Sequence, residues 1–146
     1  MLPTLGGRIQ TRIFLLCTVG VIITAILTPI LPGMTGTMGE RYTATYLILL
    51  TVLILGIIWE FIYHFLMQFR WEKDWPTLFG FITFINEGFL VWGLLLLGVV
   101  PGVDPAPPAL AFWILFMVVW ICVWAVANGP MRVPFIRWRF RGGRLI

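Results

Sequence analysis

The sequence predicts an all-α fold: a polytopic membrane protein whose four transmembrane helices form two antiparallel hairpins. Its residues are 60% hydrophobic and 11% charged, and its mean hydropathy of +0.99 is far above that of a soluble domain. Four apolar runs occupy residues 9–28, 43–69, 76–98 and 109–127. Each run approaches the roughly 20 residues that a helix needs to cross about 30 Å of hydrocarbon. The intervening segments are too short for a soluble domain, so we expect residues 1–146 to form a single membrane domain.

The first run, residues 9–28, is expected to remain in the protein as a membrane span. A cleaved signal peptide would end in a small-residue cleavage site, whereas this run ends in a turn that begins at Pro29. Gly20, Thr24 and Thr28 follow one another at four-residue spacing and form a stripe of small residues along the helix. Small residues let transmembrane helices approach closely, so the stripe predicts a helix–helix contact.

Turn and cap residues mark the ends of the other three runs. The second run, 43–69, is longer than a bilayer needs, and we expect it to tilt or to project from the membrane. Asp74 is placed to cap the third helix, and Pro76 to occupy its first turn, where a missing N–H has no cost. Pro108 opens the fourth helix, and a turn that starts at Asn128 is predicted to close it.

Lysine and arginine are distributed unevenly between the two ends of the predicted spans. Only Arg41 falls on one side, and the other nine of the ten basic residues fall on the opposite side. Basic residues accumulate on the cytoplasmic side, so we expect both termini in the cytoplasm and the protein in an inner or plasma membrane. Residues 130–146 then form a basic cytoplasmic tail. The nine residues are Arg8, Arg12, Arg70, Lys73, Arg132, Arg137, Arg139, Arg141 and Arg144.

Basic and aromatic residues together line the predicted cytoplasmic boundary, and we name this set the cytoplasmic belt. Such residues anchor a protein at an anionic lipid surface or dock it to a partner. Arginine interleaved with aromatic residues also binds nucleic acid, but a basic segment directly after a span is typical of a topology anchor, so we expect no nucleic-acid partner. The belt consists of Arg70, Trp71, Lys73, Trp75, Arg132, Arg137, Trp138, Arg139, Arg141 and Arg144.

Four polar residues are predicted to lie near mid-membrane: Glu60 and His64 in the second helix, and Asn86 and Glu87 in the third. At a rise of 1.5 Å per residue, Glu60 is about 15 Å from the predicted boundary at Arg70. A short turn joins the two helices, which places the two carboxylates at the same level, and His64 lies one turn from Glu60 on the same face. Because charged groups in lipid are expensive, we expect one inward-facing cluster.

Two level carboxylates in a low-dielectric environment favour a shared proton or a glutamate–imidazolium pair. Four uses of the cluster stay open at this point. It could be a structural network that holds the hairpin or docks it to another subunit, or a path for protons or cations. It could also bind a metal through carboxylate and imidazole ligands, or contact a quinone or substrate head group. The metal and cofactor are therefore unknown, and the sequence requires neither.

No motif for a particular reaction is present. Serine is absent from the chain, and Cys17 and Cys122 lie singly in apolar runs, as small hydrophobic residues do. We therefore expect a non-enzymatic integral-membrane subunit or anchor that docks into a larger assembly, surrounded by lipid and by other membrane subunits or copies of itself. A small oligomeric proton- or ion-coupled carrier or channel using Glu60, His64 and Glu87 is the second interpretation, and a membrane metalloenzyme is the third.

Overall fold

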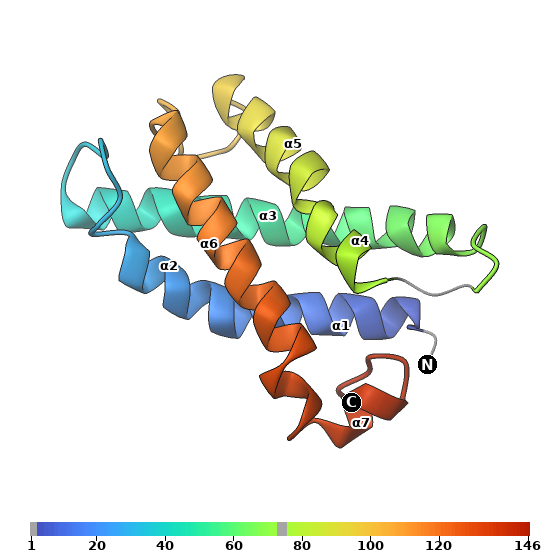
Figure 1. Ribbon diagram of the computed structural model, residues 1–146. Helices are drawn as coiled ribbons and strands as arrows, with labels where there is room; N and C mark the ends of the chain where they lie inside the picture. The colour runs from blue at the N-terminus through green and yellow to red at the C-terminus, as the bar shows by residue number, and fades with distance from the viewer. Residues whose placement is uncertain (1–2, 73–75) are drawn as a thin grey trace.

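The computed structural model describes residues 3–72 and 76–146, and these residues form helices and connecting turns with no strand (Figure 1). Four helical segments are long and apolar enough to cross a membrane: Leu5–Leu27, Met38–Met67, Thr77–Leu96 and Ala109–Arg132. The all-α class and the four candidate spans predicted from the sequence are therefore confirmed. Four such segments indicate a membrane protein.

The first span is built from α1 (Leu5–Leu15), a π-helical turn η1 (Leu16–Gly20) and α2 (Val21–Leu27). It begins four residues before the apolar run does, because the hydroxyl of Thr4 caps the helix by accepting a hydrogen bond from the backbone N–H of Gly7 at 3.1 Å. The π turn interrupts the regular helix in mid-span, a feature that often accompanies functional sites.

The second span is the single helix α3 (Met38–Met67), which begins five residues earlier than the hydropathy predicted. A capping box explains the extension: Glu40 N–H donates to the Thr37 hydroxyl, and the Glu40 carboxylate accepts from Thr37 N–H at 2.8 Å. α3 packs along the first span, where the buried hydroxyls of Thr28 and Thr45 share a hydrogen bond of 2.9 Å. The predicted stripe of small residues is thus buried at this contact.

The third span is divided at Thr83 into α4 (Thr77–Ile82) and α5 (Phe84–Leu96). Its end has a Schellman motif, in which Gly98 at φ +67° turns the chain, Gly98 N–H donates to Leu95 O, and Val99 N–H donates to Leu94 O. The expected cap residue Asp74 lies outside the described residues.

The fourth span consists of α6 (Ala109–Asn128), which ends at Asn128 as predicted, and the short 3₁₀ turn η2 (Pro130–Arg132). Figure 1 shows α6 crossing the first span at a steep angle, and it contacts η1, α2, α4 and α5. Close packing against α5 depends on Gly88, since a Cβ there would meet the rings of Trp113 and Phe116. The apolar core joins the spans through residues that include Ile48, Val52, Val91, Leu95, Phe112 and Leu115.

The C-terminal segment, residues 136–146, includes α7 (Ile136–Phe140) and folds back onto the start of α1. The indole N–H of Trp138 donates to the Thr11 hydroxyl at 2.7 Å. The backbone of Gly142 lies so close to Gly7 that a Cβ at position 7 would collide with it. The predicted basic tail is therefore packed against the bundle over these residues.

Candidate functional site

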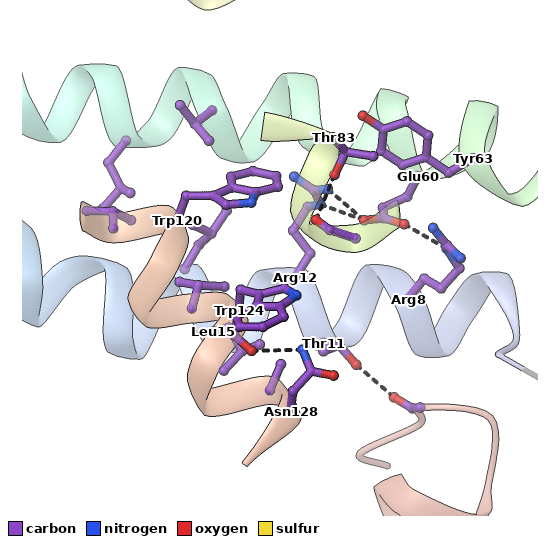
Figure 2. A pocket seen from close by; sticks show the side chains of 18 of the residues that line it. Arg8, Thr11, Arg12, Leu15, Glu60, Tyr63, Thr83, Trp120, Trp124 and Asn128 are labelled. Atoms are coloured by element: carbon purple, nitrogen blue, oxygen red, sulfur yellow. Dashed lines mark hydrogen bonds and ion pairs between the residues drawn. The ribbon is translucent and has the colours of Figure 1, made fainter. Parts of the chain in front are cut away.

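Arg12 of α1 stands at the centre of a buried network of charged residues. Its guanidinium forms two hydrogen bonds with Glu87 of α5, Nη1 to Oε2 at 2.7 Å and Nη2 to Oε1 at 2.9 Å. It also contacts Glu60 of α3, with Nη2 2.7 Å and Nε 2.8 Å from Oε1. Arg8, one turn earlier on the same face of α1, donates from Nε to the other Glu60 oxygen at 2.7 Å. Figure 2 shows Arg12 between Trp120 on one side and Glu60 with Arg8 on the other.

The network continues from Glu87 through two neutral side chains. Tyr63 of α3 donates its hydroxyl to Glu87 Oε1 at 2.9 Å, and Asn86 donates its amide to the Tyr63 oxygen at 2.7 Å. Glu87 is 2% exposed and Glu60 7% exposed, so both carboxylates are removed from the surroundings of the bundle. Each carboxylate oxygen of both residues accepts at least one hydrogen bond, which compensates their desolvation.

The position of Arg12 depends on small and aromatic neighbours. A Cβ on Gly56 of α3 would overlap the Arg12 guanidinium, so glycine provides the space that this side chain occupies. On the other side, Arg12 Cζ lies 5.9 Å from the ring centroid of Trp120 in α6, within cation–π range. The first three spans each contribute charged residues to the network, and Trp120 of the fourth span covers it.

The two arginines and two glutamates balance in charge. An isolated charge inside a bilayer is costly, and such residues are tolerated when they face the bundle interior and pair with one another. Removing one partner of a buried pair leaves an uncompensated charge, which is the main source of its energetic importance. Chemically, this arrangement joins the first, second and third spans and leaves no net charge at its centre.

The structure brings together some of the predicted cluster, but with different partners. Glu60 and Glu87 share the Arg12 guanidinium, whereas the sequence favoured a shared proton or a glutamate–imidazolium pair. Among the described residues, His64 forms no hydrogen bond or ion pair with either carboxylate: its Nε2 lies 3.4 Å from Nε2 of Gln68, and its Nδ1 is buried without a hydrogen-bond partner. Within the described part of the chain Asn86 joins the network through Tyr63 alone, and it is an exposed residue.

Sequence reasoning missed Arg8, Arg12 and Tyr63. The two arginines were assigned to the membrane boundary, although Arg12 lies within the apolar run of residues 9–28. The four-residue spacing of the two arginines places both on one face of a helix. Glu60 and Glu87 in the other spans carry two negative charges, which two cations would neutralise. This equality of charge was the signal available in the sequence.

A cavity of about 310 Å³ adjoins the network and is visible in Figure 2. Arg8, Arg12 and Glu60 form the charged part of its wall. The rest is mainly apolar and aromatic, from the first span, α3 and α6, and Trp138 with the glycines of the C-terminal segment also contributes. Mostly apolar walls with a few polar groups are typical of small-molecule sites. The apolar and aromatic lining includes Leu15, Leu16, Ile48, Val52, Leu115, Phe116, Val119, Trp120 and Trp124.

The described members of the cytoplasmic belt are largely exposed. Trp71 is 99% exposed, and Arg70 lies 5.1 Å from the Phe79 ring centroid and 4.0 Å from the Glu72 carboxylate. Trp138 differs, because it points into the bundle to contact Thr11. Lys73 and Trp75 lie outside the described residues. The exposed arginines of the belt are Arg132, Arg137, Arg139, Arg141 and Arg144.

Within residues 3–72 and 76–146, no group of three or more His, Cys, Asp or Glu side chains is arranged to hold a metal ion. The metalloenzyme interpretation therefore gains no support from the described residues. Comparison of the chain with protein-family models, with curated proteins and with solved structures gives no match.

Proposed function

We propose that this chain is a non-enzymatic integral-membrane subunit or anchor that docks into a larger membrane assembly. The observation that carries the proposal is the exposed side chain of Asn86, which lies well inside the third span. Its amide donates one hydrogen bond to Tyr63, and its other donor and its oxygen have no partner among the described residues. These groups are unfavourable when they face lipid, whereas they can form an interhelical hydrogen bond when they face another transmembrane helix. A partner helix at this face would therefore be stabilising.

The network around Arg12 supports the same function. Its charged residues already neutralise one another inside the bundle. Charges that are paired in this way suit a structural connection between helices.

We further propose two antiparallel hairpins in an inner or plasma membrane, with both termini in the cytoplasm. The contact between Arg8 and Glu60 joins the beginning of the first span to the end of the second, and the contact between Thr28 and Thr45 joins the other ends. Arg8 and Arg12 are paired inside the bundle, so the sidedness depends mainly on the arginines and lysine of the cytoplasmic belt.

Purification from native membranes in mild detergent, followed by mass spectrometry of the co-purified chains, tests the proposal. Stoichiometric partner chains, or further copies of this chain, are expected. Asn86→Leu should reduce their recovery, while Leu50→Ala, a change at another exposed position of a span, should not. A monomer that purifies without any partner in both the unmodified chain and the Leu50→Ala control would contradict the docking function.

The cytoplasmic belt offers a separate test of how the chain docks. Arg137, Arg139 and Arg141 are exposed, so changing all three to Gln should leave the bundle intact. We expect weaker recovery of the partner, or weaker association with anionic lipid, at unchanged membrane insertion. Unchanged recovery together with unchanged lipid association would exclude these arginines from docking.

A proton- or ion-coupled carrier is the second candidate, because Glu60 and Arg12 line the cavity as well as forming the network. Proteoliposomes with a pH-sensitive dye distinguish the two functions. A structural network predicts no flux above that of empty liposomes. A flux that Glu60→Gln abolishes, while the protein stays folded, would favour the carrier.

A further inference from the structure

The cavity beside Arg12 has the dimensions and walls of a ligand site, and its occupant is a question separate from docking. Its volume of about 310 Å³ lies at the lower end of the range for small-molecule pockets. Helices of the first, second and fourth spans contribute apolar and aromatic side chains to the walls. These walls favour a lipid-soluble molecule with a compact apolar body.

The charges in the wall argue for an uncharged molecule. Arg8 and Arg12 are paired with Glu60, and Arg12 is also paired with Glu87, at distances of 2.7 Å. A charged ligand would have to enter an apolar space without a free counter-ion or would have to break these pairs, and either is unfavourable. An uncharged ligand leaves the network as it is.

Two unpartnered polar atoms define the polar group that the ligand should carry. Thr24 is fully buried, and its hydroxyl has no hydrogen-bond partner within residues 3–72 and 76–146; the indole N–H of Trp120 is also buried without a partner in the same part of the chain. Both residues line the cavity. An indole N–H can only donate, and a hydroxyl can donate as well as accept, so an oxygen acceptor would satisfy either group once its side chain turns toward the cavity.

We propose that this cavity binds an uncharged, lipid-soluble molecule that carries a carbonyl or similar oxygen acceptor. The apolar body would lie among Leu115, Phe116 and Val119, and the oxygen would accept from Trp120 or Thr24. Buried polar groups normally have partners, and the missing partner here is a ligand atom.

Three ring compounds of matched shape test the two parts of this proposal. Duroquinone is neutral with carbonyl acceptors, durene has the same methylated ring without them, and trimethylbenzoate carries a carboxylate on a similar ring. The full chain in lipid nanodiscs is equilibrated with each compound, and empty nanodiscs measure partition into lipid. We expect duroquinone to bind about 3–10 times more tightly than durene, the effect of one hydrogen bond, and trimethylbenzoate to bind most weakly.

Two variants that each remove one hydrogen-bond donor locate the binding. Thr24→Val and Trp120→Phe each remove a donor, and at least one should abolish the preference for duroquinone over durene. Trp92→Phe removes an indole N–H outside the cavity and should leave binding unchanged. The proposal is overturned if no compound binds above the empty nanodiscs, as for a cavity that holds only water. Equal binding of durene and duroquinone, tightest binding of trimethylbenzoate, or an unchanged preference in both variants would also overturn it.

Discussion

The guanidinium of Arg12 and the carboxylate of Glu87 meet through two hydrogen bonds of 2.7 and 2.9 Å, between residues 75 positions apart in the chain. This bidentate geometry is specific to arginine, whose planar group presents two parallel N–H donors. The same guanidinium contacts Glu60, so one side chain of the first span holds both the second and the third. One residue therefore bonds directly to both of the other spans.

Arg12→Gln is predicted to destabilise the protein by about 3–5 kcal/mol, because it leaves the buried carboxylate of Glu87 without its cation and Glu60 with Arg8 alone. Arg12→Lys should cost less, since it keeps the charge but cannot form the bidentate contact. Unfolding in detergent measures both effects. Combining Arg12→Gln with Glu87→Gln should cost less than the sum of the single changes, with a coupling energy of about 1–3 kcal/mol. Strictly additive effects would show that the pair is not coupled.

Gly56→Ala is predicted to displace Arg12, because the added Cβ would overlap its guanidinium. Overpacking of this kind costs about 1–3 kcal/mol in unfolding measurements. Gly93→Ala is the matched control: that glycine also lies within a helix, but a Cβ there meets nothing within 4 Å. The control should be neutral or more stable by roughly 0.5–1 kcal/mol, from helix propensity alone. Equal effects of the two changes would contradict the close contact at Gly56.

Gly7→Ala is predicted to release residues 136–146 from the start of α1, since its Cβ would collide with the backbone of Gly142. The neighbouring Gly6→Ala is the control, because its Cβ would meet nothing within 4 Å. Limited digestion with trypsin should cleave after the arginines of the C-terminal segment faster in Gly7→Ala than in Gly6→Ala. Identical cleavage rates would mean that the segment is not held by this contact.

The topology prediction places the loops at Thr35 and Asp104 outside the cell and Arg139 inside it. All three side chains are exposed, so single cysteines there are suited to labelling once Cys17 and Cys122 have been replaced by Ala. A membrane-impermeant maleimide added to intact cells should label positions 35 and 104, whereas position 139 should react only after the membrane is opened. Labelling of position 139 in intact cells would reverse the proposed orientation.

The sequence by itself determined the four apolar helices, because length and hydropathy are local properties of each run. It also predicted that Glu60 and Glu87 lie at one level of the bundle, since the helical rise is fixed and the turn between their helices is short, and both carboxylates do contact Arg12. The first residue of a helix was harder to predict from hydropathy. The capping box of Thr37 and Glu40 extends α3 beyond its apolar run, because hydrogen bonding and not hydropathy decides where a helix begins.

Only the tertiary structure decided which groups meet. Arg12 reaches both carboxylates because the first span packs against α3 with Gly56 opposite it, and this contact joins residues far apart in the chain. His64 shares a helix face with Glu60, yet the closer cation is the arginine of the neighbouring helix. The contact of Gly7 with Gly142 and the cavity near Trp120 likewise arise where distant segments pack together, which helical period and hydropathy do not specify.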